Sequence, residues 1–174
     1  MKILGRADEQ DVEVLQETAL FNDLDRDAIG KILDICRKVR FGKNDMIMKE
    51  GEGGKTIYLM LDGTVEVAKN LVLQDDDENV GNKVFIRLHA EDHPVFGEIA
   101  LLENTGRTAT VKALSTCTLY EIQHSDLLKL TENDHELGYR IMLNLAKIVS
   151  SRLRKADEDI VKLSTVLSIV LKES

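Results

Sequence analysis

The sequence predicts a mainly β fold with flanking helices: an antiparallel β-roll or jelly-roll barrel with N-terminal helices and a long C-terminal helix. Three observations predict it. Apolar residues recur every three or four positions over about residues 8–40, short apolar runs punctuated by glycine fill residues 38–123, and helical spacing returns from about residue 125. We expect one domain over residues 1–141 and a coiled-coil-like helix over residues 142–174.

Composition narrows the classes of protein that this chain can represent. It has 174 residues, of which 43% are hydrophobic and 31% charged, and its net charge is −8. This length supports one domain with a buried core, and the acidic balance without a basic cluster argues against nucleic-acid binding. We find no apolar run long enough for a membrane span and no secretory signal. Cys36 and Cys117 lack disulfide or zinc spacing, which favours a cytoplasmic protein.

The N-terminal region carries the pattern of amphipathic helices. Asp25 is the expected N-cap of one of them, because its carboxylate can accept hydrogen bonds from the amides of the following turn. Near Lys38 the period changes, and we expect the strands to begin there. The residues at helical spacing are Val12, Leu15, Leu20, Leu24, Ile29, Ile32, Leu33, Ile35 and Val39.

The middle of the chain reads as a series of short strands. Asp62-Gly63 divides the run 56–69 and predicts a tight hairpin, while Gly42 and a cluster of glycines at 51, 53 and 54 mark other turns. Further runs cover residues 41–48, 71–73, 84–88, 108–112 and 117–122. The acidic run at 75–78 lacks the alternating ligands of a calcium loop, and we expect a solvated hairpin loop.

The C-terminal region carries a heptad pattern, with Gly138 as a candidate helix breaker. Its apolar residues are separated by four and three positions in turn, which is typical of a left-handed coiled coil. They are Met142, Ala146, Val149, Leu153, Ala156, Ile160, Leu163, Leu167 and Val170. The pattern predicts a parallel homodimer through residues 142–170, and the alternative is a helix packed on its own domain. Additional apolar residues near the C-terminus leave room for an unidentified effector protein.

Residues 96–110 combine the groups that a phosphate and a sugar require. Gly97 allows close backbone approach, and a short helix over residues 98–102 would present free amides to an anion. The guanidinium of Arg107 can donate two parallel hydrogen bonds to phosphate oxygens. The carboxylate of Glu98 fits a sugar hydroxyl on the same ligand. Strand residues would supply an apolar wall for a base, namely Val84, Ile86 and Leu88. The pattern therefore predicts a nucleotide site.

This segment resembles the phosphate-binding cassette of the cyclic nucleotide-binding domain family. The resemblance rests on Gly97, Glu98, Arg107 and Ala109, in order and at the family's spacing, and it extends from about residue 20 to residue 153. It implies cAMP or cGMP as the ligand, with no other cofactor and no metal. It also implies ligand contacts along the cassette. The implied contact residues are Phe96, Gly97, Glu98, Ile99, Ala100, Arg107, Thr108 and Ala109.

Two further roles follow from the resemblance, each with an alternative. A hydroxyl residue after the arginine occurs in members that favour cGMP, but also in some that respond to cAMP, and Thr108 is equally typical of a plain strand residue. We prefer cAMP as the commoner bacterial messenger. The helix after the barrel closes over the base in this family, which would bring Arg152 onto the base. The alternative for Arg152 is a solvated charge on a helix flank.

The sequence departs from the DNA-binding members of the family. The residues after Leu153 continue the heptad and form no basic helix-turn-helix, so we do not expect DNA reading. No catalytic set is evident, because the histidines are scattered and no cysteine lies beside a base. We expect a sensor that shifts its C-terminal helix on ligand binding. The alternative is a dimerisation or docking module with a degenerate nucleotide pocket.

Overall fold

The computed structural model describes residues 1–6, 11–70, 83–102 and 106–172. The strands are β1 (Lys2–Arg6), β2 (Cys36–Phe41), β3 (Met46–Met48), β4 (Thr56–Asp62), β5 (Thr64–Asn70), β6 (Lys83–His89), β7 (Val95–Phe96), β8 (Thr110–Ala113) and β9 (Cys117–Gln123). The helices are α1 (Val12–Glu17), α2 (Arg26–Ile35), α3 (His124–Asn133) and α4 (His135–Lys172), with 3₁₀ turns η2 (Ala19–Phe21), η3 (Ala90–Asp92) and η4 (Glu98–Leu101).

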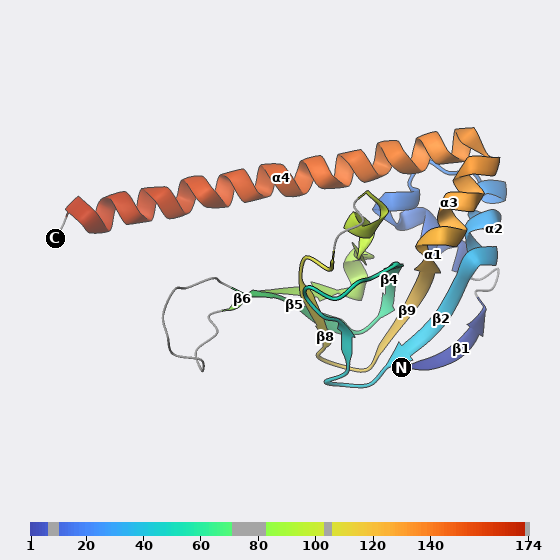
Figure 1. The fold of residues 1–174 in the computed structure, drawn as a ribbon, viewed down its shortest axis with the longest axis horizontal. Coiled ribbons are helices and arrows are strands. Elements are labelled where there is room, and N and C mark those ends of the chain that lie inside the picture. Colours follow the sequence, from blue (N-terminus) through green and yellow to red (C-terminus); the bar gives the residue numbers. More distant parts are fainter. Residues whose placement is uncertain (7–10, 71–82, 103–105, 173–174) are drawn as a thin grey trace.

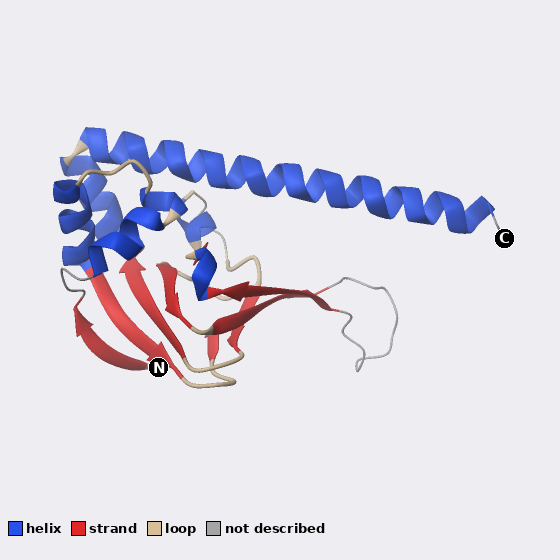
Figure 2. Ribbon diagram, turned by 180° about the vertical axis from the view of Figure 1, so that it is seen from behind, coloured by secondary structure: helices blue, strands red, loops and turns tan. Residues whose placement is uncertain are grey.

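In the described part of the chain, the strands form two antiparallel sheets that make up a β-roll (Figure 1). One sheet has the order β1-β2-β9-β4-β7 and the other the order β3-β8-β5-β6. Helices α1, α2 and α3 gather at one end of the roll, and α4 runs away from them across it (Figure 2). The predicted fold class, a roll with N-terminal helices and a long C-terminal helix, is confirmed.

The core has two parts, one on each side of the first sheet. Between the two sheets, Val39, Met60 and Leu119 belong to one apolar cluster. On the other side, Ile122 of β9 joins residues of the helices, including Ile141 of α4, in a second cluster. Successive strand residues point to opposite faces, so β2, β4, β7 and β9 of the first sheet contribute to both clusters. The site described below lies at the first cluster, under α4.

One helix cap and one hairpin turn form as the sequence predicted. The Asp25 side chain caps α2 by accepting a hydrogen bond of 2.8 Å from the Ala28 amide. Gly63 joins β4 to β5 with a φ of +100°, a left-handed conformation that favours glycine. The runs at 71–73 and 75–78 lie outside the described residues.

The boundary between N-terminal helices and strands was predicted wrongly. Helix α2 ends at Ile35, and residues 36–41 form β2, which pairs with β9 along its whole length. Val39 is buried between the sheets as part of this strand, because strand alternation also places apolar residues two and four positions apart. Strand β1, which pairs with β2 at the sheet edge, was not predicted.

Gly138 is not a helix breaker. The helical segment is interrupted at Asp134, between α3 and α4, and the Asp134 side chain accepts a hydrogen bond from the Leu137 amide at 3.1 Å. Helix α4 then runs without interruption to Lys172, past the predicted domain boundary at residue 141. A Cβ on Gly138 would lie 3.0 Å from the Thr131 carbonyl oxygen. The glycine therefore allows α3 and α4 to pack closely.

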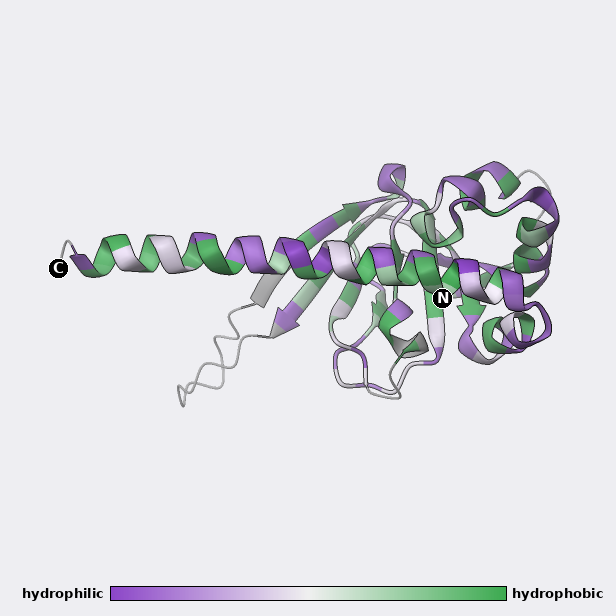
Figure 3. Cartoon of the chain, turned by 90° about the horizontal axis from the view of Figure 1, so that it is seen from above, coloured by the Kyte–Doolittle hydropathy of each residue, from purple (hydrophilic) through white to green (hydrophobic). Residues whose placement is uncertain are grey.

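Helix α4 has a fixed first half and a projecting second half. Leu137, Ile141 and Leu145 are buried against the domain, and the Asn144 amide donates to the carbonyl oxygens of Leu20 and Asn22. From residue 150 to 172 every α4 residue is exposed, and apolar segments recur along this part (Figure 3). Among the described residues, no helix is both long and apolar enough to cross a membrane.

Candidate functional site

A cavity of about 170 Å³ opens between the β-roll, the turn η4 and helix α4. Most of the predicted cassette residues line it, together with Arg152 from α4. Its lining residues are Met48, Val67, Phe96, Gly97, Glu98, Ile99, Gly106, Arg107, Thr108, Ala109, Val111 and Arg152. The structure therefore brings the two halves of the predicted cassette and the predicted helix residue to one place.

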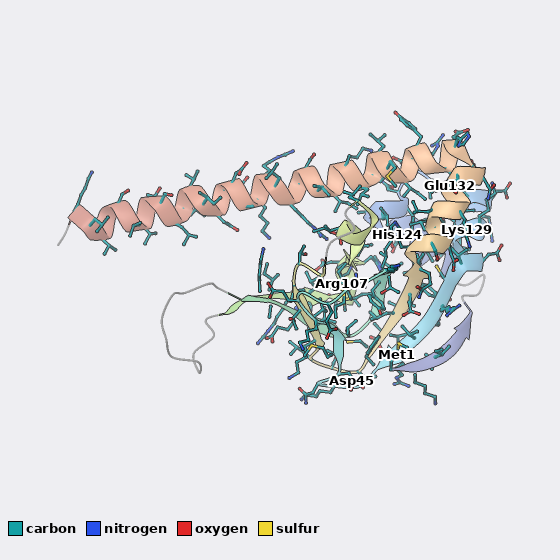
Figure 4. The ribbon with its side chains drawn as sticks, in the orientation of Figure 1. Met1, Asp45, Arg107, His124, Lys129 and Glu132 are labelled. Atoms are coloured by element: carbon teal, nitrogen blue, oxygen red, sulfur yellow. The ribbon has the colours of Figure 1, made fainter. Side chains whose placement is uncertain are left out.

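Arg107 holds a charged group inside the roll, where Figure 4 labels it. The residue is 9% exposed. Its Nη1 donates to the Thr56 carbonyl oxygen at 2.8 Å, and its Nη2 donates to Thr56 Oγ1 at 2.7 Å. Burial lowers the pKa of Arg107 by desolvation, but a guanidinium stays charged in proteins. Both Thr56 oxygens are neutral, so these hydrogen bonds do not neutralise the guanidinium, and its positive charge is available to an anion.

Two glycines make room for this guanidinium. Gly97 has a φ of +82°, and a Cβ there would lie 2.6 Å from Arg107 Nη1 and 2.7 Å from the Thr56 carbonyl oxygen. A Cβ on Gly54 would overlap Arg107 Nε. Sequence analysis missed Gly54 and Thr56 as site residues. The glycine cluster was visible, but it was interpreted only as a turn.

Glu98 opens the turn η4 and is 1% exposed. Its Oε1 accepts from Arg152 Nη1 in an ion pair, and Arg152 Nη2 donates to the Val95 carbonyl oxygen at 2.9 Å. The sequence placed Arg152 on the base of a ligand or in solvent. The structure places its guanidinium on the carboxylate that was predicted to hold the sugar.

The apolar wall differs from the predicted one. It is formed by Met48, Val67, Phe96 and Val111, whereas Ile86 is 53% exposed and does not line the cavity. Ile86 lies directly opposite Val67 in the β5–β6 pairing, so it shares the face of Val67 one strand farther out. The side chains of Val84 and Ala100 lie outside the described residues.

A second layer of aromatic rings supports the wall. Phe96 stacks on Tyr58 with ring centroids 5.6 Å apart, and Tyr58 meets Phe41 edge-on at 6.2 Å. The Tyr58 hydroxyl donates to Glu121 Oε1 at 3.3 Å. Burial raises the pKa of Tyr58, chiefly by desolvation, so the hydroxyl stays protonated. Because Tyr58 is held at both ends, Phe96 is fixed beside Gly97.

The chain is similar in sequence to a known domain family and to proteins that contain such a domain. Residues 38–134 match the model of the cyclic nucleotide-binding domain. The chain is 29% identical over 164 residues to a cGMP-dependent protein kinase of Drosophila melanogaster, covering 92% of this chain and 14% of the kinase. It is 30% identical over 124 residues to a cAMP-dependent protein kinase regulatory subunit of Schizosaccharomyces pombe, covering 71% of this chain and 27% of that subunit.

Similar folds are found among solved structures. A cyclic nucleotide-binding domain from Methylobacillus flagellatus superposes with a TM-score of 0.76 at 21% identity, covering 91% of this chain and 86% of that one. This likeness concerns the fold. The chain spans about a seventh of the Drosophila kinase and about a quarter of the Schizosaccharomyces pombe regulatory subunit.

Proposed function

The chain belongs to the cyclic nucleotide-binding domain family, and from that premise we propose that it binds cAMP or cGMP in the cavity around Arg107 and acts as a regulatory sensor. Two relatives support a nucleotide of this kind, since one is a cGMP-dependent protein kinase and the other is a cAMP-dependent protein kinase regulatory subunit. No other cofactor and no metal is part of the proposal. Within the described residues, no cluster of metal-binding side chains is found.

One observation carries this proposal: the cavity lining has a net positive charge. Among the described lining residues, the charged groups are the guanidinium groups of Arg107 and Arg152 and the carboxylate of Glu98. Arg152 already neutralises Glu98, and the charge of Arg107 is left over. A positive charge in a partly desolvated cavity attracts an anion strongly, because the local dielectric is lower than that of water. A cyclic phosphate carries a single negative charge and would balance it.

The other lining groups fit the rest of a nucleotide. We assign the exocyclic phosphate oxygens to Arg107 and to backbone amides of Gly97, Ile99 and Ala100. The ribose 2′-hydroxyl is assigned to Glu98. The base would lie against the apolar wall of Met48, Val67, Phe96 and Val111, which replaces the predicted wall of Val84 and Ile86. Thr108 is exposed at the cavity, where its hydroxyl can meet an exocyclic group of the base, and Ala109 leaves space beside it.

The test is a calorimetric titration of the protein with cAMP and with cGMP, repeated on Arg107→Ala. Loss of charge-assisted hydrogen bonds worth about 2–4 kcal/mol predicts binding weakened by about 30- to 1000-fold. Arg40→Ala is the matched control, because Arg40 is an exposed arginine on β2. Circular dichroism would verify that each variant is folded. Equal affinity of Arg107→Ala and wild type would remove the site assignment.

The proposed sensor forms a homodimer through residues 142–170. The heptad residues of α4 are exposed, whereas Leu137, Ile141 and Leu145 on another side of the helix are buried against the domain. Tyr139 is also exposed and lies three residues before Met142, so it extends the stripe by one position. The apolar stripe therefore lies on a different side of α4 from the residues that contact the domain. This arrangement supports pairing with the stripe of a second copy of the chain, and it disfavours packing of the stripe on its own domain.

We propose a regulatory role in the cytoplasm, with an effector protein that remains to be identified and without DNA binding. Thr108 carries a hydroxyl that could act as a nucleophile only with a base beside it. The described residues that line the cavity include no histidine to act as that base and no cysteine to act as a nucleophile itself. Cyclic nucleotide incubated with the protein should therefore be recovered unchanged. The second candidate function is a ligand-free docking module, which the exposed stripe on α4 also supports. Binding of neither cyclic nucleotide, together with a stable dimer, would favour that function.

A further inference from the structure

Glu121 carries a carboxylate that faces the inside of the β-roll. It follows Leu119 by two positions on β9, and Leu119 belongs to the apolar cluster between the two sheets, so both side chains lie on the same face of the strand. Glu121 is only 8% exposed. Burial of a charged group costs free energy unless hydrogen bonds compensate it, so the contacts of this carboxylate require a physical explanation.

A tyrosine connects the carboxylate to the site. Tyr58 lies directly opposite Glu121 in the β4–β9 pairing, and its hydroxyl donates to Glu121 Oε1 at 3.3 Å. Thr56 precedes Tyr58 by two positions on β4, so the two side chains lie on one face of the strand. Burial raises the pKa of Tyr58 chiefly by desolvation, while a hydrogen bond with the Thr56 side chain lowers it and Glu121 raises it further. The Tyr58 hydroxyl therefore lies between the side chains of Thr56 and Glu121.

The donors and acceptors of these groups follow one direction. Thr56 Oγ1 accepts from Arg107 Nη2 at 2.7 Å, so the Thr56 hydroxyl can donate its own proton to Tyr58. The Tyr58 hydroxyl can accept that bond while it donates to Glu121. The chain of hydrogen bonds thus begins at a cation and ends at an anion. Opposite charges at its two ends polarise both hydroxyls in the same sense, which strengthens each bond.

We propose that Glu121 is a positioning residue of the nucleotide site, which holds the Arg107 guanidinium in place through the hydroxyls of Tyr58 and Thr56. This inference rests on the proposed function. Glu121 does not line the cavity, so it acts on the ligand only through Arg107. Because two hydroxyls separate the carboxylate from the guanidinium, Glu121 orients Arg107 and leaves its positive charge to the phosphate.

Arg37 offers the alternative explanation for Glu121. It lies directly opposite Glu121 in the β2–β9 pairing, and opposite charges at such positions stabilise a sheet. Arg37 is exposed, however, whereas Glu121 is buried. If Glu121 acted only through this pair, loss of Arg37 and loss of Glu121 would have the same effect on ligand binding. Arg37→Ala therefore serves as the matched control.

The test measures the affinity of each variant for cAMP and for cGMP by calorimetric titration, with melting curves to verify folding. Glu121→Leu removes the acceptor at the end of the chain, and we expect it to weaken binding about 3- to 10-fold. Glu121→Gln keeps an acceptor oxygen, so it should bind at least about twofold more tightly than Glu121→Leu. Arg37→Ala should bind within about twofold of wild type.

A double substitution shows whether Glu121 acts through Thr56. Thr56→Val removes the hydroxyl but keeps the backbone carbonyl oxygen that accepts from Arg107 Nη1. It should weaken binding about as much as Glu121→Leu, and Glu121→Leu should cause no further loss in the Thr56→Val protein. Tyr58→Phe keeps the ring and removes the hydroxyl, so it tests the same chain if Glu121→Leu does not fold.

The outcomes separate this inference from the proposed function. Wild-type binding that neither Glu121→Leu nor Tyr58→Phe weakens beyond twofold would overturn the positioning role and leave the proposed function standing. A full further loss from Glu121→Leu in the Thr56→Val protein, or an equal loss in Arg37→Ala, would also overturn it. Absence of binding to wild type would overturn both. Weaker binding by Glu121→Leu, partial recovery by Glu121→Gln and no further loss in the Thr56→Val protein support the positioning role.

Discussion

The guanidinium of Arg107 lies so close to the backbone of Gly54 that a Cβ at residue 54 would overlap Arg107 Nε. Any side chain at this position must displace the guanidinium from its hydrogen bonds to Thr56. A glycine in the turn before β4 thus determines where the charge in the cavity sits. A Cβ on the neighbouring Gly53 would have no atom within 4 Å. Of these two adjacent glycines, therefore, only Gly54 must lack a side chain for Arg107 to keep its position.

The first prediction is that Gly54→Ala weakens cyclic nucleotide binding. The methyl group would push Arg107 away from the position assigned to the phosphate, and we expect a loss of at least about tenfold in affinity. Gly53→Ala is the matched control and should bind like wild type. Calorimetric titration of both variants, with melting curves to verify folding, makes the comparison. Equal affinities for the two variants would contradict the role of Gly54.

The second prediction concerns the proposed homodimer. Ile160 lies in the heptad stripe and Val161 lies next to it outside the stripe, and both side chains are exposed in the single chain. Ile160→Glu places two carboxylates in the coiled-coil seam, and we expect it to weaken dimerisation on the order of 100-fold. Sedimentation analysis over a range of protein concentrations measures this. Val161→Glu should leave the dimer intact, and dissociation by both variants to the same degree would argue against the heptad seam.

Local patterns in the sequence predicted much of the fold. The hairpin at Asp62-Gly63, the cap at Asp25 and the long helix each depend on neighbouring residues, and each is present. The change from helix to strand after Ile35 was misplaced, because Val39 satisfies helical and strand spacing equally. Strand β1 has too few residues and too little alternation to stand out, and its pairing with β2 is what defines it.

The site was predictable only within its local segments. Gly97, Glu98 and Arg107 lie close together in the chain and were found, whereas Thr56 lies 51 residues from Arg107 and was missed. The pair of Arg152 with Glu98 spans 54 residues. Such contacts depend on how the roll closes and on which turn of α4 reaches η4. Likewise, assigning the base wall to Val67 instead of Ile86 required the register of the sheets.

The third prediction concerns the two thiols. Cys36 and Cys117 are both buried, and burial raises the pKa of Cys36 to about 12, chiefly by desolvation and then by the nearby Asp11 carboxylate. Because the thiolate is the reactive form, neither cysteine should be alkylated by iodoacetamide in folded protein at pH 8. Both should react in denaturant. Rapid modification of one thiol in the native protein, followed by mass spectrometry, would contradict this burial.

The raised pKa of Cys36 also has a consequence for stability. The unfolded thiol ionises near its ordinary pKa of 9.0, whereas the folded thiol keeps its proton to about 12. The folded state therefore binds more protons in this range, and its stability falls as the pH rises from about 9 to 12. Chemical denaturation at several alkaline pH values measures the slope. The variant Cys36→Ala should show a shallower slope than wild type, and an unchanged slope would show that this thiol does not contribute.

The fourth prediction concerns Asp134, at the break between α3 and α4. Its Oδ1 accepts from the Leu137 amide at 3.1 Å, and its Oδ2 lies 2.5 Å from Lys31 Nζ. The hydrogen bond from Lys31 holds the pKa of Asp134 below its usual value of 3.8, and the Leu137 amide acts in the same direction. The stabilisation is therefore complete above about pH 4 and is lost as the pH falls through the depressed pKa.

Substitution Asp134→Ala removes both the cap of α4 and the contact to α2. We expect a lower melting temperature at pH 7 and a shallower loss of stability below pH 4 than in wild type. Asp157→Ala removes an exposed carboxylate from the projecting part of α4 and serves as the control. If both variants melt at the wild-type temperature, the contacts of Asp134 do not contribute to holding the start of α4. A selective effect of Asp134→Ala would show that the contacts of Asp134 to Leu137 and Lys31 together hold the half of the helix from which the projecting half extends.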